Sequence, residues 1–122
     1  MRPYSELAGL EALYLEDSYV LGIEQGPDEL RFDLEAVVTE DHPRWTPPKK
    51  GEQYTYRRVS LVFPHAKQVE WMSQSQQPFT DASGEADYGN VDTFQWEPGR
   101  FELEGDWGHV RVTSDSPIVI ET

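Results

Sequence analysis

Residues 94–112, FQWEPGRFELEGDWGHVRV, carry the clearest structural signal in the chain. Apolar and polar side chains alternate on both sides of Pro98–Gly99, a pair suited to the centre of a type II turn. Gly105–Asp106 are suited to a second two-residue loop. The two turns together predict an antiparallel meander of three strands with one buried face. The side chains expected on that face are Phe94, Trp96, Phe101, Leu103, Val110 and Val112.

The same two turns predict a register for the meander. Two-residue loops place Trp96 opposite Phe101, and then Phe101 opposite Val110. They also make His109 the cross-strand neighbour of Glu102, which suits an opposite-charge or hydrogen-bonded pair.

A short echo in the sequence, DYGNV at 87–91 and DWGHV at 106–110, allows two interpretations. The copies could form a shared ligand site that uses Asp87, Asp106 and His109. Alternatively, each copy is a turn that leads into a strand. We favour the second, because turn chemistry explains both copies and the histidine has no counterpart in the first.

Period-2 alternation predicts further strands outside the meander. The expected strands are 18–25 and 29–38, joined by a turn at 26–29, then 53–63, 67–72 and 118–121. Within 53–63, Tyr54 and Tyr56 share one face, whereas the later apolar residues share the other. Either both faces are covered, or a bulge lies near Arg57–Arg58.

Three segments lack this alternation. Ser5–Tyr14 has leucines near helical spacing, so we expect a short helix or an irregular lead-in there. Residues 39–52 and 73–87 are rich in turn formers and are expected to be long loops. The fold class predicted for this single domain, 1–122, is all-β. About seven antiparallel strands would form a sandwich or a partly open barrel.

The charge of the chain narrows the classes of partner. Asp and Glu number 23 against 10 Lys and Arg, which gives a net charge of −13. Such a chain is repelled by nucleic acid and by anionic lipid and favours a basic protein partner. No apolar run approaches the roughly 18 residues of a membrane helix. The opening residues do not resemble a signal peptide, so we expect a cytoplasmic protein.

Two groups of residues are candidates for binding. Arg44, Trp45, Arg57 and Arg58 combine positive charge with an aromatic ring, which suits a protein contact or a small anionic ligand. Local charge balance and a Trp45 that closes the core are the alternatives. The second group is acidic, and we expect it to face outward from the meander as part of a partner-binding face: Glu102, Glu104 and Asp106.

Metal and catalytic motifs are sparse. The chain has no cysteine, which excludes a thiolate site and a cysteine nucleophile. A site built from His65, His109 and carboxylates is the metal alternative, although no paired histidine spacing supports it. Residues 81–92 are similar to a calcium loop but carry Ala86 where glycine is expected, so we expect no calcium. The sequence therefore predicts no metal and no cofactor, and it favours a non-catalytic protein over an enzyme.

The closing stretch, FQWEPGRFELEGDWGHVRVTSDSPIVIE, resembles the C-terminal pattern of small, mostly β bacterial proteins. These are grouped as uncharacterised proteins or as immunity proteins of polymorphic toxin systems. The resemblance rests on the acidic-hydrophobic strand, the Gly-Asp-Trp-Gly turn and the alternating valines. It implies a cytoplasmic antitoxin that masks a toxin domain without catalysis, and it assigns no functional residue.

Two functional hypotheses follow. The first is a non-catalytic acidic binding protein, in the form of an immunity protein that covers a basic toxin surface. The alternative is an enzyme or small-ligand-binding β-barrel with His65, His109 and carboxylates in its mouth.

Overall fold

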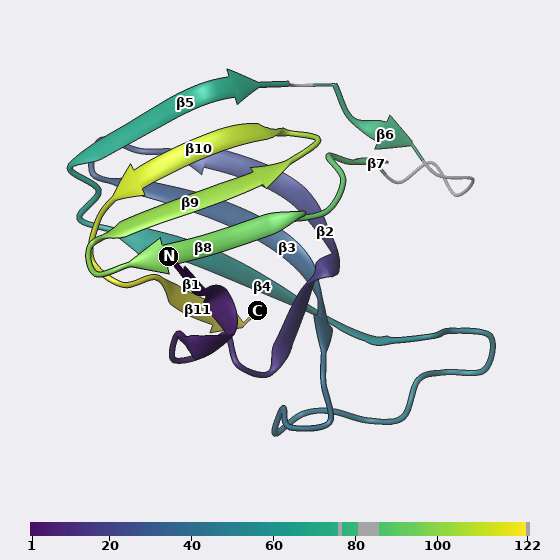
Figure 1. Cartoon of the computed structure of the whole chain (residues 1–122). Helices are drawn as coiled ribbons and strands as arrows, with labels where there is room; N and C mark the ends of the chain where they lie inside the picture. The colour runs from purple at the N-terminus through teal and green to yellow at the C-terminus, as the bar shows by residue number, and fades with distance from the viewer. Residues whose placement is uncertain (76, 81–85, 122) are drawn as a thin grey trace.

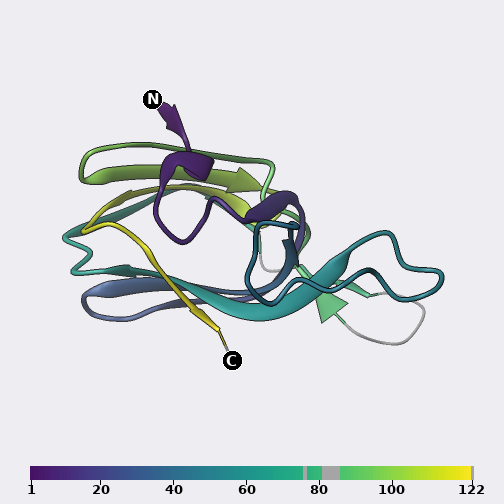
Figure 2. The ribbon, with the colours of Figure 1, turned by 90° about the horizontal axis from the view of Figure 1, so that it is seen from below.

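The computed structural model describes residues 1–75, 77–80 and 86–121 of the chain. Two antiparallel sheets of five and four strands face each other as a sandwich and do not close into a barrel over these residues (Figure 1). The all-β prediction is confirmed, and the sandwich is the alternative that forms. The turned view in Figure 2 shows the two layers edge-on.

The five-stranded sheet has the order β1-β8-β9-β10-β5 and the four-stranded sheet the order β11-β4-β3-β2. A short ribbon of β6 and β7 forms a separate two-stranded sheet. Strand bounds along the chain are β1 Arg2–Pro3, β2 Leu13–Gln25, β3 Glu29–Val38, β4 Thr55–Pro64, β5 Gln68–Gln74, β6 Phe79–Thr80, β7 Ala86–Asp87, β8 Thr93–Glu97, β9 Arg100–Gly105, β10 Gly108–Thr113 and β11 Ile118–Glu121.

The first turn of the meander forms as expected, with Trp96 opposite Phe101. The second prediction was wrong in register, because the loop residues are Asp106 and Trp107, and Phe101 pairs with Val112. Because the loop lies one residue later than predicted, each residue pairs with a partner two positions away from the predicted one. Side chains alternate with a period of two, so every side chain keeps its predicted face. Five of the six expected inward residues are buried and Trp96 is partly buried.

Local packing explains why the loop lies one residue later in the sequence than predicted. A Cβ on Gly105 would lie 2.3 Å from the backbone oxygen of Asn90 and 2.4 Å from the indole nitrogen of Trp107. Glycine is therefore needed at the strand end, where Trp107 turns inward. Only 1% of the Trp107 surface is exposed. The register is decided by burial of this indole rather than by the turn propensity of Gly105–Asp106.

The lead-in at Ser5–Tyr14 does not become an α-helix. A 3-10 turn, η1 (Tyr4–Glu6), is followed by further turns, and β2 starts at Leu13. Backbone N–H groups of Leu7, Leu10 and Leu13 each bond to the carbonyl oxygen three residues earlier. All three leucines are buried. Their spacing of three produces successive tight turns, so of the two alternatives the irregular lead-in forms.

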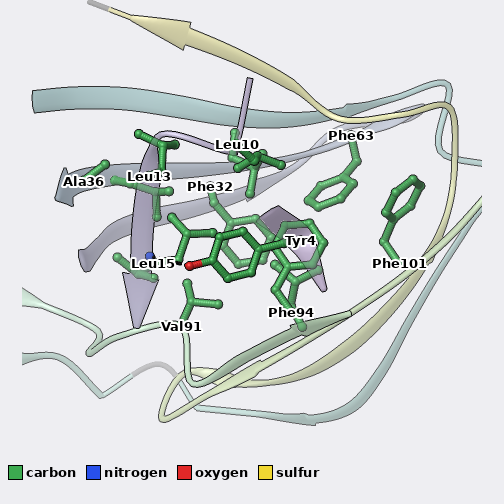
Figure 3. Packing of buried hydrophobic residues seen from close by; sticks show 14 of the residues in the cluster. Tyr4, Leu10, Leu13, Leu15, Phe32, Ala36, Phe63, Val91, Phe94 and Phe101 are labelled. Carbon is green, nitrogen blue, oxygen red and sulfur yellow. Dashed lines mark hydrogen bonds between the residues drawn. The ribbon is translucent and has the colours of Figure 1, made fainter. Parts of the chain in front are cut away.

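The core lies between the two sheets and is rich in aromatic rings (Figure 3). Phe63 of β4 lies 5.9 Å from Phe94 and 5.4 Å from Phe101, measured between ring centroids. Trp107 contacts Phe32 at 5.0 Å in an edge-on arrangement. Side chains 59–63 of β4 are all buried, and its pairing with β3 shows no register shift. Both faces of β4 are thus covered over residues 59–63, and there is no bulge near Arg57–Arg58 in its pairing with β3. This is the first of the two alternatives that the sequence left open.

The loop at 39–52 contains no strand and no helix, as expected (Figure 1). The second expected loop, 73–87, is shorter than predicted, because β5 continues to Gln74 and the β6–β7 ribbon occupies part of it. The first half of the calcium-like segment, 81–85, lies outside the described residues.

Candidate functional site

Alternation along β9 and β10 directs a group of charged side chains to the outer face of the five-stranded sheet. His109 Nε2 lies 3.6 Å from a carboxylate oxygen of Glu102, and His109 Nδ1 lies 3.8 Å from one of Glu104. Arg111 donates a hydrogen bond through Nε to the other oxygen of Glu102. That hydrogen bond lowers the pKa of Glu102, although partial burial opposes it. The expected contact of His109 with Glu102 is present, but Glu104 is its direct cross-strand partner.

A depression of about 570 Å³ lies on this outer face. Its lining includes charged residues from the four neighbouring strands β8, β9, β10 and β5: Glu70, Glu97, Arg100, Glu102 and Arg111. Arg100 and Arg111 are held by Glu97 and Glu102. The surface is open and charged, which suits contact with polar side chains of a partner.

Carboxylates gather at one end of the meander, where Asp92, Glu104 and Asp106 lie together. The pKa of Asp92 is raised, first by burial and then by the negative charges of Asp106 and Glu104. The backbone N–H of Asp92 bonds to the carbonyl oxygen of Glu104, which holds the two strands in place. No described residue forms an ion pair with Asp92 or Asp106. The charges of Asp92 and Asp106 are therefore uncompensated within the described part of the chain.

The two copies of the Asp-aromatic-Gly motif pack against each other. Gly89 N–H donates to the Asp87 carboxylate at 2.8 Å, which closes the turn in the first copy. The Trp107 indole N–H donates to the carbonyl oxygen of Asn90 at 2.9 Å. A Cβ on Gly89, which has φ of +93°, would lie 3.0 Å from a carboxylate oxygen of Asp106. These contacts support the turn-and-strand interpretation. That the copies bind no common ligand stays a prediction.

Most of the basic candidates converge on one carboxylate that the sequence did not indicate. His42 Nε2 lies 2.5 Å, Arg57 Nε 3.4 Å and Arg44 Nη1 3.7 Å from oxygens of Glu121 in β11. No spacing pattern links Glu121 to the loop that carries Arg44, because only the pairing of β11 with β4 brings them together. This arrangement is the local charge balance that was the alternative to a binding patch.

The other two residues of that group lie elsewhere. Arg58 follows Arg57 in β4 and therefore points to the opposite face, with Glu35 of β3 directly across. Trp45 is only partly buried and packs against the hydrophobic core. The structure therefore does not assemble the four residues into one patch.

The structure does not bring His65 and His109 together into one site either. His65 pairs with Asp115 at 2.6 Å in an exposed turn, with a φ of 51°. It precedes the end of the β5–β10 pair where Gln68 meets Thr113, whereas His109 is near the other end. Among the described residues, no group of three His, Asp or Glu side chains is placed to hold a metal ion.

The outer face of the four-stranded sheet carries a tyrosine cluster: Tyr14, Tyr19, Tyr54 and Tyr56. Ring centroids of Tyr14 and Tyr54 are 6.2 Å apart, those of Tyr54 and Tyr56 are 6.2 Å apart, and those of Tyr19 and Tyr56 are 6.1 Å apart. Tyr54 donates its hydroxyl hydrogen bond to Asp17 at 2.5 Å. This bond is the main cause that raises the pKa of Tyr54 to about 12.

The sequence predicted that Tyr54 and Tyr56 share a face, but it did not predict that Tyr14 and Tyr19 lie on the same face. Register shifts lie between Tyr14 and Tyr19 in the β2–β3 pairing, so that the strand accommodates extra residues and both rings face outward. A bulge of this kind leaves no clear signal in alternation of hydrophobicity.

No helix among the described residues has the length and apolar character needed to span a bilayer. Comparison of the chain with protein-family models, with curated proteins and with solved structures finds no match.

Proposed function

We propose that this chain is a non-catalytic binding protein for a basic protein partner. The contact surface is the outer face of β8, β9 and β10 in the five-stranded sheet. The observation that carries the proposal is the exposure of Glu104 and Asp106 at one end of this face. The pKa of Asp92 is raised first by burial and then by the negative charges of Asp106 and Glu104, so the three carboxylates lie close enough to repel one another. A Lys or Arg side chain of a partner would relieve this repulsion.

The chemistry of the face also supports a partner that arrives by electrostatic attraction. The net charge of −13 attracts a basic protein at long range and speeds its association. At contact, Glu102 and Glu104 are presented on adjacent outward positions of a rigid strand. Arg111 and His109 hold Glu102, so less side-chain entropy is lost when a partner binds it.

The finer form of the proposal is an immunity protein that masks a basic toxin surface. It is supported by the resemblance of the C-terminal stretch to such proteins and by a charge opposite to that of the expected toxin surface. Masking needs only a stable complementary face, which fits a mechanism without catalytic residues.

The test is to measure association with a partner recovered from the native host, or with a panel of basic toxin domains. We expect the association rate constant of the unaltered protein to fall steeply between low and high salt. The double variant Glu104→Gln/Asp106→Asn should slow association more than the matched variant Glu24→Gln/Glu29→Gln. The control removes the same charge from exposed positions of the β2–β3 hairpin. Equal slowing in both variants, or a rate indifferent to salt, would contradict the proposed face.

A further inference from the structure

A groove of about 400 Å³ lies at the base of the 39–52 loop, beside the tyrosine cluster. The residues that line it include the aromatic Tyr14, Trp45 and Tyr54 and the acidic Glu40. Tyr14 is 39% exposed, and Trp45 is partly exposed, so the rings remain available to a ligand. We call this feature the aromatic groove.

The chemistry of the groove favours a cation. Aromatic ring faces carry partial negative charge and attract cations that lie over them. Glu40 adds a full negative charge, and Asp17 holds the Tyr54 hydroxyl at the same edge of the sheet. The planar guanidinium of arginine stacks on aromatic faces and also hydrogen-bonds to carboxylates, whereas the ammonium of lysine does not stack. The groove is therefore better suited to arginine than to lysine.

The basic residues close to this region do not neutralise it. Arg44, Arg57 and His42 are held by the Glu121 carboxylate. Lys49 and Lys50 are exposed beyond Pro48 and are not part of the groove lining. Glu40 is thus the one charged side chain among the residues that line the groove.

We propose that the aromatic groove receives an arginine side chain of the protein partner. The identity of the partner as a basic protein rests on the proposed function, but the groove belongs to the other sheet. Tyr56 lies next to Tyr54 of the groove, with 6.2 Å between the ring centroids, and its ring gives a protein partner more contact area than a free arginine would have. Tyr and Trp are the residues enriched at the energetic centres of protein interfaces, which agrees with this assignment.

The test uses hexa-arginine as a probe on the unaltered protein, with binding followed by NMR of the backbone amide signals and of the tyrosine and tryptophan ring signals. We expect saturable shifts of the Tyr14, Tyr54 and Trp45 ring signals. Hexa-lysine at the same concentration should bind more weakly. Shifts confined to Glu102, Glu104 and their neighbours, or equal binding of the two peptides, would overturn the proposal.

Three variants test the rings and the carboxylate of the groove. Tyr14→Ala should weaken hexa-arginine binding about two- to fivefold, which is typical of a partly exposed cation–π contact. Tyr14→Phe keeps the ring and should bind like the unaltered protein. Tyr19→Ala is the matched control, because Tyr19 is 38% exposed on the same strand but does not line the groove. Glu40→Gln should weaken binding and reduce its dependence on salt. Equal effects of Tyr14→Ala and Tyr19→Ala would overturn the assignment to the groove.

Failure of this inference is distinguishable from failure of the proposed function. If the natural partner binds and is sensitive to Glu104→Gln/Asp106→Asn but not to Tyr14→Ala, the proposed function stands and the groove proposal fails. If the partner is sensitive to Tyr14→Ala but not to the acidic variant, the groove proposal stands and the acidic face fails.

Discussion

The two outer faces of the sandwich differ in chemistry although one core supports both. The five-stranded sheet presents an ion pair between Arg111 and Glu102, with His109 close to Glu102 and Glu104. The four-stranded sheet presents the tyrosine cluster, and two exposed isoleucines of β11 lie at its other edge. The inward residues of both sheets are similar aliphatic and aromatic side chains. This difference shows that the fold constrains the inner positions, whereas the outer positions are free to carry function.

Replacement of Trp107 should have the largest effect, because this indole connects the layers beneath both faces. Trp107→Ala removes contacts with Phe32 and Trp71 and a hydrogen bond to Asn90. We expect a loss of about 3–5 kcal/mol in the free energy of unfolding, measured with denaturant. Trp107→Phe should lose less, because a ring remains in the cavity.

The same unfolding experiment tests whether the faces depend on one core. In the unaltered protein, NMR signals of Tyr54 and of Glu102 should disappear at the same denaturant concentration. Two separate midpoints would mean that the sheets unfold independently, and the comparison between faces would then be one between two units.

A second effect concerns the tyrosine face alone. Asp17→Asn removes the carboxylate that accepts the hydrogen bond of the Tyr54 hydroxyl, so the pKa of Tyr54 should fall from about 12 toward the ordinary tyrosine value of about 10. A pH titration followed by tyrosinate absorbance or by NMR of labelled tyrosine measures this shift. Glu35→Gln is the control, because Glu35 contributes to the raised pKa of Tyr56 and is not among the causes for Tyr54. An unchanged Tyr54 titration in Asp17→Asn would contradict the assigned cause.

A smaller effect is expected on the charged face. The pKa of Glu102 is lowered in the folded state, so its contribution is present above the unfolded pKa of about 4.3 and is lost as the pH falls through the folded pKa. Glu102→Gln should therefore cost roughly 0.5–1 kcal/mol at pH 7, and the difference should vanish in acid. Glu104→Gln, with only the 3.8 Å contact to His109, should cost less. Thermal unfolding over a pH series distinguishes the two variants.

The smallest effect should have the opposite sign. The pKa of Asp92 is raised in the folded state, so its ionised form opposes folding at neutral pH and this penalty decreases as the pH falls. Asp92→Asn should stabilise the protein slightly at pH 7, with a gain that shrinks in high salt. A destabilised variant would mean that Asp92 makes a favourable contact, and the acidic end would then not be uncompensated.

Strand positions were predictable because the alternation of apolar and polar residues is local in the sequence. It reflects the burial of one face of each strand, which contributes a large free energy. Residues 29–38 form β3 with the predicted bounds, and the inward face of the meander is also as predicted. The second turn was not predictable in detail. Its loop residues depend on the fit of Trp107 beneath Asn90, a contact that a turn propensity does not describe.

The candidate sites were predictable to different extents. The predicted cross-strand pairing of His109 with Glu102 was wrong, because Glu104 lies opposite His109, but the two side chains still approach because both face outward on adjacent strands. The convergence of His42, Arg44 and Arg57 on Glu121 did not follow, because it depends on which strand β11 joins. The aromatic groove also escaped prediction. Tyr14 reaches it through a bulge, and Trp45 through a loop with no periodic pattern.

The placement of the two terminal strands has a consequence for the order of assembly during synthesis. β1 joins the sheet built mainly from residues 68–113, whereas β11 joins the sheet built from residues 13–64. Each sheet thus contains one strand from the far end of the chain, and these pairings close the longest loops. The β2–β3–β4 hairpins can form on a ribosome-bound chain before residues 118–121 are made, whereas β11 can pair with β4 only after those residues have emerged. In pulse-labelled hydrogen exchange during refolding, amides of Ile118–Glu121 should gain protection after those of β3.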